Sequence, residues 1–278
     1  GQVSVSGYGK GGAIYSYYDA EVTIETSTFT GNDAATFGGA ISMATGGSLD
    51  ITDSVFDSNE ILTSMLSPSS GGAVYAYDLD EMSISGSEFT DNVGFFYGGA
   101  VFANSMVSET EISDSTFSGN EIQSKRGGAV EFSAGASLVI TRCVFEDNTS
   151  PEGGAALSVY QDVTLTITDS DFSGNANTSS RESYGGAIFV FDDNNGEDLT
   201  ITGSTFEDNE SELSGGALYV YGMDTVTIEE SVFNGNVASA INTSSSYYGG
   251  AANFYDISEL SITNTDACGN EADYAGGF

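Results

Sequence analysis

The stretch that decides the fold runs from Gly71 to Asn92 and reads GGAVYAYDLDEMSISGSEFTDN. It starts with a Gly-Gly-Ala triplet and ends with the pattern I-x-x-x-x-F-x-x-N, formed by Ile84, Phe89 and Asn92. Both features return along the whole chain. Recurrence at a period of about 20–50 residues is the sequence signature of a protein assembled from stacked copies of one unit.

The two features occur nine times and are followed by the pair Gly276-Gly277, at intervals of 26 to 34 residues that average about 29. In every unit an Ile stands five residues before the Phe position, and an Asn stands three residues after it. The triplets begin at Gly11, Gly38, Gly71, Gly98, Gly127, Gly153, Gly185, Gly215 and Gly249. The asparagines are Asn32, Asn59, Asn92, Asn120, Asn148, Asn175, Asn209, Asn236 and Asn270. Insertions fall between an Asn and the next triplet, at residues 60–70, 176–184 and 237–248, which predicts that one corner of each unit carries surface loops.

Within a unit the hydrophobic period is two residues, which is the period of a half-buried strand. Leu165–Thr168, for example, alternates between apolar and polar side chains, and no longer segment shows a helical face. The sequence therefore predicts an all-β fold, a right-handed parallel β-helix of about nine coils of roughly 29 residues, with about three short strands in each. Leucine-rich repeats would show a Leu/Asn consensus, and propeller blades would need about 40 residues or more.

Coils of a β-helix stack about 4.8 Å apart, so equivalent residues form columns along the axis. We expect the Ile column to be buried and the Phe column to stack ring on ring beside it. The Asn column should lie at a corner where each amide bonds the next one and the backbone tolerates left-handed dihedral angles. The Gly-Gly pairs should provide positive φ angles or close approach at another corner.

The composition excludes several classes of function. The 278 residues include 41 Asp and Glu, 5 Lys and Arg and no His, for a formal net charge of −36. Without His there is no Ser-His-Asp or Cys-His nucleophile and no His-ligated metal. So few cations cannot neutralise a phosphate backbone, which excludes nucleic acid as a partner. No apolar run approaches the roughly 20 residues of a membrane span, so we also predict no direct membrane insertion. The carboxylates should lie on turns, loops and outward strand positions. There they repel other copies of the chain, so we expect copies to associate only where ions screen this charge, in salty or calcium-rich surroundings such as a cell exterior.

The paired signals Gly71-Gly72-Ala73-Val74 and Phe89-Thr90-Asp91-Asn92 resemble the passenger repeats of chlamydial polymorphic outer membrane proteins. They also resemble the repeats of a wider group of secreted and surface right-handed parallel β-helix proteins. The resemblance covers the chain from Gly11 to Phe278. It implies a β-helix exposed at a cell surface and a role in adhesion.

The residues after each triplet alternate again, so the fourth and sixth positions of the motif should point inward and the fifth and seventh outward. Many outward residues are aromatic: Tyr15, Tyr17, Tyr75, Tyr77, Phe102, Phe189, Phe191, Tyr219, Tyr221 and Tyr255. An exposed column of rings suits a contact surface, either a platform on which sugars stack or a lateral seam between filaments. The alternatives are that surface loops cover the column, or that the assignment is one residue off, which would exchange the two faces.

A short acidic segment suggests a metal site. Asp192, Asp193, Asn194 and Asp198 place oxygen ligands of the kind that Ca²⁺ prefers at close spacing. The segment departs from an EF-hand loop because Gly196 is misplaced and no Glu follows at the twelfth position. Two interpretations of these residues follow. In the first they form a plain solvated turn and the protein has no cofactor, and in the second they bind calcium.

Polysaccharide lyases and glycosidases often use β-helices, so catalysis is the competing interpretation. Asn264-Thr265-Asp266 matches one fragment of the polygalacturonase signature, but the accompanying Gly-His-Gly needs a His that the chain lacks. A calcium-dependent pectate lyase needs an Arg base beside clustered carboxylates, and none of Arg126, Arg142 and Arg181 shows such a cluster. We predict no enzyme activity, and paired Asp and Glu side chains leave a glycosidase as the open alternative.

Four sequons, at Asn148, Asn177, Asn209 and Asn242, are permitted glycosylation sites in a secreted eukaryotic protein. Cys143 and Cys268 lie four coils apart, roughly 19 Å by the coil spacing, which is beyond the reach of a disulfide. They are either buried singletons or partners of cysteines elsewhere.

The sequence predicts a single β-helix repeat domain over residues 1–278. A solenoid needs polar caps and none is visible, so we expect either a segment of a longer protein or subunits that stack end to end. The function that fits is a non-catalytic, extracellular or cell-surface β-helix with a structural or adhesive role, as a surface filament, spacer or adhesin module. The alternative is a carbohydrate-active enzyme (a polysaccharide lyase or glycosidase) or a polysaccharide-binding module on a pectin-lyase-like β-helix. The expected partners are copies of the chain, end to end or lateral, further repeats of the same chain, or surface glycans.

Overall fold

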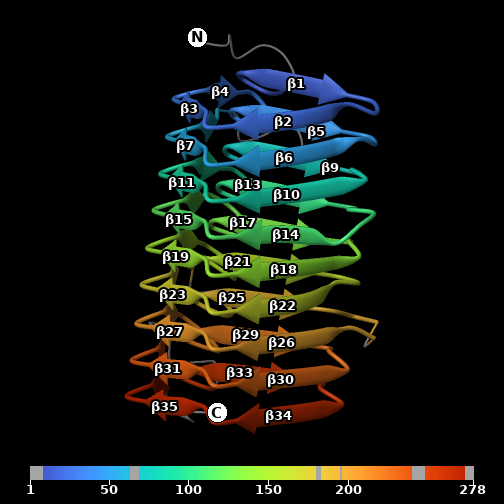
Figure 1. The fold of residues 1–278 in the computed structure, drawn as a ribbon. Coiled ribbons are helices and arrows are strands. Elements are labelled where there is room, and N and C mark those ends of the chain that lie inside the picture. Colours follow the sequence, from blue (N-terminus) through green and yellow to red (C-terminus); the bar gives the residue numbers. More distant parts are fainter. Residues whose placement is uncertain (1–8, 63–68, 180–182, 195, 240–247, 273–278) are drawn as a thin grey trace.

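The computed structural model describes residues 9–62, 69–179, 183–194, 196–239 and 248–272. The chain winds from the blue end to the red end of Figure 1 in coils that lie directly on one another. Each coil gives one strand to each of four parallel sheets, and every sheet contains nine strands. The described residues form no helix, and so none that is long and apolar enough to cross a membrane. The prediction of an all-β parallel β-helix of nine coils is confirmed.

The first sheet consists of the strands that follow the Gly-Gly-Ala triplets. Its members are β1 (Ile14–Tyr17), β5 (Ile41–Ala44), β9 (Val74–Tyr77), β13 (Val101–Asn104), β17 (Val130–Ser133), β21 (Leu157–Tyr160), β25 (Ile188–Phe191), β29 (Leu218–Tyr221) and β33 (Ala252–Tyr255). In β9, Val74 and Ala76 are fully buried, whereas Tyr77 is 42% exposed. The predicted inward and outward positions are therefore correct in this sheet except in the sixth coil, where Leu157 points inward and Ser158 outward.

The second sheet carries the Ile column. Its strands are β2 (Glu21–Glu25), β6 (Ser48–Thr52), β10 (Glu81–Ser85), β14 (Thr110–Ser113), β18 (Ser137–Thr141), β22 (Thr164–Thr168), β26 (Asp198–Thr202), β30 (Thr225–Glu229) and β34 (Glu259–Thr263). Every isoleucine of the column from Ile24 to Ile228 is buried, and Ile262 in the last coil packs partly buried against the same core. The predicted buried column is confirmed.

The third sheet carries the Phe column. Its strands are β3 (Thr28–Thr30), β7 (Val55–Asp57), β11 (Glu88–Thr90), β15 (Thr116–Ser118), β19 (Val144–Glu146), β23 (Asp171–Ser173), β27 (Thr205–Glu207), β31 (Val232–Asn234) and β35 (Asp266–Cys268). From Phe29 to Phe233 the rings form one stack, with adjacent centroids 4.5–4.9 Å apart and ring planes within 7° of parallel. Burial of each ring contributes about 1.5–3 kcal/mol, so this stack is a large part of the core's stability.

A fourth sheet, which the sequence did not predict, follows the Asn column. Its strands have two residues each: β4 (Asp33–Ala34), β8 (Glu60–Ile61), β12 (Val93–Gly94), β16 (Glu121–Ile122), β20 (Thr149–Ser150), β24 (Ala176–Asn177), β28 (Glu210–Ser211), β32 (Val237–Ala238) and β36 (Glu271–Ala272). Strands this short leave no periodicity in the sequence. They are visible only because their neighbours in adjacent coils bond to them.

The Asn column forms a continuous ladder of hydrogen bonds along one corner. Asn120 is typical, because its backbone N and its Nδ2 both donate to Oδ1 of Asn148 at 3.0 Å, and Nδ2 also donates to the Phe89 carbonyl at 2.9 Å. This confirms the predicted ladder. The left-handed dihedrals predicted at this corner lie on the residue before each Asn, as at Asp91 (φ 51°) and Asp147 (φ 54°). The preceding residue makes the turn and leaves the Asn side chain in position to bond along the axis.

A second ladder, which the sequence did not reveal, joins the second and third sheets. The Ser87 backbone N donates to Ser115 Oγ at 3.1 Å, and Ser87 Oγ donates to the Ser85 carbonyl at 2.9 Å. Cys143 takes the place of the serine in one coil, and its backbone N donates to Ser170 Oγ at 3.1 Å. The ladder satisfies backbone donors at a turn where the sheet hydrogen bonds stop.

The Gly-Gly corner needs glycine for two separate reasons. Gly71 has a φ of 70°, which side chains rarely tolerate. Gly72 faces the next coil so closely that an added Cβ would lie 1.9 Å from the Gly99 carbonyl oxygen. The two predicted roles of the pair are thus divided between its two members.

The sixth coil is displaced by one residue from the pattern in the sequence. Gly153 forms β-bridges with Arg126 and Tyr184, which precede the triplets of the adjacent coils. Gly154 therefore takes the position of the first glycine, with a φ of 55°. As a result Tyr160 faces outward from the first sheet.

Candidate functional site

The outward side of the first sheet carries many aromatic side chains. The predicted contact residues all lie there: Tyr15, Tyr17, Tyr75, Tyr77, Phe102, Phe189, Phe191, Tyr219, Tyr221 and Tyr255. The structure adds Tyr160 from β21, and Phe37, Tyr97 and Tyr184 from the turn that precedes the sheet. We call the surface formed by all these residues the aromatic face.

Most rings of the aromatic face form two stacked blocks, while Tyr15 and Tyr17 of the first coil stack on each other, with centroids 6.4 Å apart. In the first block the Tyr75 ring centroid lies 4.4 Å from that of Phe37 and 5.2 Å from that of Phe102. In the second block the centroids of Phe191 and Tyr221 are 4.7 Å apart. These separations are in the favourable range for aromatic pairs, so each block is a rigid platform that exists before any ligand binds.

Exposure varies along the aromatic face. Tyr17, Tyr77 and Tyr255 are 46%, 42% and 61% exposed, whereas Phe102 and Phe189 are only 9% exposed. The two phenylalanines are covered because side chains of the preceding turns lie against their rings. The expected exposed column therefore has open ends and a covered middle, and its role as a contact surface stays a prediction.

An ion pair lies between the two blocks of rings. Arg126 precedes the fifth triplet, and its Nε donates to Oε1 of Glu131 in β17 at 3.2 Å. Glu131 pairs with Phe102 in the sheet, so it stands in a column where other coils place rings. The Arg126 guanidinium lies 3.9 Å from the centroid of the Tyr160 ring and 5.3 Å from that of Tyr97. Cation–π attraction therefore holds the guanidinium between a ring from the coil before and a ring from the coil after.

The Glu131 carboxyl is almost fully buried, with 1% of its side chain exposed. Burial raises its pKa to about 7, against the lowering effect of Arg126 and of the Ser158 hydroxyl. Burial also lowers the pKa of Arg126, but attraction to Glu131 more than offsets this, so the guanidinium stays charged. Among the described residues no hydrogen-bond partner reaches Glu131 Oε2 or Ser158 Oγ.

Two hollows flank the Arg126 side chain. The larger, of about 210 Å³, contains the buried carboxyl, and we call it the Glu131 hollow. Its lining includes Arg126, Glu131, the rings of Tyr97, Phe102 and Tyr160, and the polar side chains of Asn104, Ser133 and Gln161. The smaller hollow, of about 170 Å³, is lined by Arg126, Glu152, Gly153, Tyr184 and Phe189.

Chemically, this part of the face combines flat apolar rings with hydrogen-bonding groups. Arg126 is a charged donor, and Glu131 Oε2 is an acceptor without a partner among the described residues. Burial raises the pKa of Tyr219 to about 12 and also raises the pKa of Tyr75, so both phenols keep their protons at neutral pH. The surface can stack against the apolar side of a ligand while it exchanges hydrogen bonds with the ligand's polar edge.

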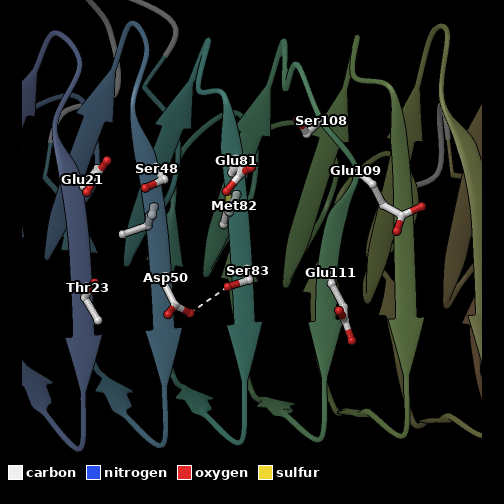
Figure 2. Close-up of a pocket in the computed structure, with 11 residues that line it drawn as sticks. Glu21, Thr23, Ser48, Asp50, Glu81, Met82, Ser83, Ser108, Glu109 and Glu111 are labelled. Atoms are coloured by element: carbon white, nitrogen blue, oxygen red, sulfur yellow. Dashed lines mark hydrogen bonds between the residues drawn. The ribbon is translucent and has the colours of Figure 1, made fainter.

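A shallow groove of about 460 Å³ lies on the outward side of the second sheet. Figure 2 shows its acidic side chains in rows across β2, β6, β10 and β14, with Asp50 accepting a hydrogen bond from Ser83 at 2.7 Å. Its carboxylates are Glu21, Asp50, Glu81, Glu109 and Glu111. Nowhere in the described part of the chain are three or more His, Cys, Asp or Glu residues grouped to hold a metal ion. The groove is therefore a like-charged solvent face.

The predicted calcium ligands are engaged in separate local contacts. Asp192 is only 2% exposed, and its carboxylate accepts from the backbone N of Asn194 at 3.0 Å and of Gly196 at 3.4 Å. Asp193 accepts from Gln161, and Asp198 accepts from the Thr225 backbone N at 3.2 Å. Asp192 thus closes its own turn, which is more ordered than the plain solvated turn of the other interpretation. Calcium binding here stays a prediction.

Three of the predicted glycosylation sites are corrected by the structure. Asn148 and Asn209 are fully buried, and Asn177 is 4% exposed. The nitrogen that would carry the glycan already donates two hydrogen bonds in each, for example from Asn148 to the Phe117 carbonyl and to Asn175 Oδ1, both at 2.9 Å. A glycan cannot be placed there without breaking the coil. The fourth site, Asn242, lies outside the described residues.

The two cysteines lie in different coils, Cys143 between β18 and β19 and Cys268 in β35. Cys143 is buried, and burial raises its pKa to about 11, which keeps the thiol protonated and unreactive at neutral pH. Cys268 is exposed in β35.

Sequence reasoning missed the centre of the aromatic face. The one-residue displacement of the sixth coil concealed Tyr160, although the alternation of Leu157–Tyr160 would have revealed its outward position. Arg126 and Glu131 also left a signal. Each stands where other coils place an aromatic residue, directly before a triplet or at its fifth position.

A family model described as the right handed beta helix region matches residues 12–196. Comparison with curated proteins and with solved structures gives no match. The matched residues are more than half of the chain, and they run from the first triplet to the turn after β25. On the repeat, the four parallel sheets and this match, the chain belongs to the right-handed β-helix family.

Proposed function

We propose that the protein is a non-catalytic, adhesive β-helical module that is displayed outside the cell and binds glycan-coated surfaces through its aromatic face. The observation that carries the proposal is the pair of stacked ring blocks on an otherwise acidic rod. Contiguous rings at a protein surface mark contact sites, and the open faces of Tyr77 and Tyr255 suit the apolar C–H faces of sugars. The resemblance to surface-exposed passenger repeats agrees with a role in adhesion.

The charge of the chain favours a glycan over a second copy of the chain as the occupant of this face. Two copies would each bring a formal charge of −36, and that repulsion acts over about 10 Å even in 0.1 M salt. An uncharged polysaccharide meets no such barrier. Lateral self-association is therefore the alternative outcome of the test below.

The polar groups of the face support binding without cleavage. A glycosidase needs two carboxyl groups about 5–9.5 Å apart on either side of the scissile bond. Of the carboxylates that line the two hollows, Glu131 is paired with Arg126 at 3.2 Å and Glu152 with Lys125 at 2.8 Å. We expect prolonged incubation with polysaccharides to release neither reducing ends nor unsaturated products.

Adhesion of protein-coated microspheres to polysaccharide-coated surfaces tests the proposal. The variant Tyr17→Ser/Tyr77→Ser/Tyr255→Ser removes exposed rings from the aromatic face, and we expect it to lose most of the adhesion of the wild type. The matched control replaces three exposed apolar side chains elsewhere by serine, and we expect it to adhere normally. These side chains are Leu62, Val107 and Val232. Equal adhesion of both variants, or microspheres that bind only one another, would contradict the proposal.

A further inference from the structure

The middle of the aromatic face is built differently from its ends. In the fifth-position column, Phe102 is followed by Glu131 and Ser158 before the rings resume at Phe189. Two polar residues thus interrupt a column of rings, and Arg126 reaches across from the turn to bond the first of them. A sheet face that only had to be covered would gain more stability from continued rings, because burial of a charged pair costs desolvation energy.

The Glu131 hollow holds an acceptor that the chain itself does not satisfy. Glu131 Oε2 is buried and has no partner among the described residues, and it belongs to a group that lines the hollow. An unpaired buried acceptor costs free energy, and a charged one costs more, so a donor supplied by a ligand would recover that energy. A ligand that donates a hydrogen bond to Glu131 Oε2 would therefore complete the site.

The charges around the hollow decide which class of donor fits. A cationic ligand would meet the Arg126 guanidinium, which already occupies the ring faces of Tyr97 and Tyr160. An anionic ligand would compete with Glu131 for Arg126 inside a chain of net charge −36. A neutral hydroxyl avoids both penalties, because it donates to Glu131 Oε2 while its oxygen accepts from a neighbouring donor.

The shape and lining of the hollow extend this argument to a whole ligand. Its volume of about 210 Å³ is below the roughly 300–1,000 Å³ of sites for drug-sized molecules, so it suits a single small ring. Tyr97 and Tyr160 line the hollow with apolar carbon, and because Arg126 and Phe191 cover the two faces of the Tyr160 ring, this ring meets a ligand with its edge. Asn104 and Gln161 add side-chain amides at the polar edge. A pyranose has this combination of apolar C–H faces and a rim of hydroxyl groups.

We propose that the Glu131 hollow is a binding subsite for one uncharged pyranose unit of a neutral polysaccharide, with Glu131 Oε2 accepting a sugar hydroxyl and Arg126 donating beside it. This inference rests on the proposed function and deepens it, because it names the class of glycan and places its central contact. The ring blocks on either side of the hollow then contact the neighbouring sugars of the same polymer. The polymer would run along the axis of the β-helix, across successive coils.

Native gel electrophoresis with soluble polysaccharides in the gel tests this inference, because an acidic protein migrates readily and is slowed in proportion to its binding. The probes are β-glucan, galactomannan and arabinoxylan as neutral polymers, and polygalacturonate as an anionic one. We expect at least one neutral polymer to slow the wild type and polygalacturonate to leave it unchanged. For Glu131→Gln, which keeps the size of the side chain, we expect the dissociation constant to rise about tenfold or more.

Two controls separate recognition from charge and folding. Glu111→Gln makes the same charge change on the outward side of the second sheet, and we expect it to bind like the wild type. Arg126→Gln/Glu131→Gln removes both charges together, so it leaves no unpaired ion, and we expect it to bind as weakly as Glu131→Gln while it melts cooperatively.

The outcomes also separate this inference from the proposed function. If Glu131→Gln binds a neutral polymer like the wild type while the triple tyrosine variant does not, the subsite is wrong and the adhesive face stands. If polygalacturonate is the polymer that binds, the neutral ligand is wrong and the adhesive face again stands. If no polymer slows the wild type, both proposals are wrong.

Discussion

Individual side chains in this β-helix bond along its axis, and most repeat what their counterparts do in adjacent coils. Asn120 and Asn148 show this most clearly, since one amide links three coils through its donors and its acceptor. A residue that departs from its column is therefore informative. Thr110 stands in a buried column between Met82 and Leu138, and Glu131 stands in a column of rings.

The Thr110 hydroxyl should destabilise the fold. The residue is 1% exposed, and its Oγ1 has no hydrogen-bond partner among the described residues. Thr110→Val keeps the shape and removes the unpaired group, so we expect the free energy of unfolding in urea to rise by about 1 kcal/mol. The control Thr166→Val, on the outward side of β22, should change it by less than about 0.5 kcal/mol. A destabilised Thr110→Val would show that the hydroxyl is satisfied in solution.

The buried Glu131 carboxyl should make stability depend on pH. Its folded pKa of about 7 lies above that of the unfolded chain, so between these values the unfolded state binds fewer protons and stability falls as pH rises. Relative to Glu131→Gln, we expect the wild type to lose about 3 kcal/mol of unfolding free energy between pH 4 and pH 8 and little beyond. Urea unfolding at a series of pH values measures the difference. Parallel curves for the two proteins would mean that the carboxyl is solvated.

At the scale of the strand, the alternation of inward and outward residues decides what each position tolerates. In β18, Ile140 is fully buried in the core, whereas the next residue toward the N-terminus, Val139, faces outward. Adjacent residues of one strand therefore provide a matched pair for testing the column.

Ile140→Asp should prevent folding, because it buries a carboxylate with no partner between Ile112 and Ile167. Val139→Asp places the same group in solvent, and we expect it to cost less than about 1 kcal/mol. Thermal melts followed by circular dichroism distinguish the two. A cooperative melt of Ile140→Asp close to that of the wild type would contradict the buried column.

Three of the four strands in a coil could be predicted from sequence, because the Ile, Phe and Gly-Gly-Ala positions recur at nearly fixed offsets. The fourth could not, since two residues are too few to show a period. For the aromatic face, the sequence predicted the rings at its two ends but not the residues at its centre. Its centre depends on which coils neighbour one another, and Arg126 meets Tyr97 and Tyr160 only after the coils stack. The displaced glycine at Gly153 concealed the last of these rings.

At the scale of the whole molecule, the charge of −36 is spread over a rod whose stability comes from apolar columns and axial hydrogen bonds. The apolar columns carry most of the fold, and few carboxylates, such as those of Asp192 and Glu131, are buried in it. Such a surface repels itself, which weakens the compact state and keeps copies of the chain apart at low ionic strength. Salt is therefore the condition that should change the behaviour of this protein most.

We expect the melting temperature to rise by several degrees between about 10 mM and 300 mM NaCl, as the Debye length falls from about 30 Å to below 10 Å. Each gain of about 1 kcal/mol corresponds to roughly 2–4 °C for a chain of this size. At matched ionic strength, a further rise with CaCl₂ but not with MgCl₂ would support calcium at Asp192–Asp198. Differential scanning calorimetry measures both effects, and a melting temperature independent of NaCl would contradict the account of the charge.

The most direct test of the central claim, that the aromatic face makes the adhesive contact, is hydroxyl-radical footprinting of the protein free and bound to polysaccharide-coated beads. Modification rates would be compared at Tyr77 and Tyr255 on the face and at Val107 and Val232 away from it, all of which are exposed in the free rod. We predict that binding slows modification of the two tyrosines several-fold and leaves Val107 and Val232 unchanged. Protection of Val107 and Val232, with the tyrosines still reactive, would contradict the claim.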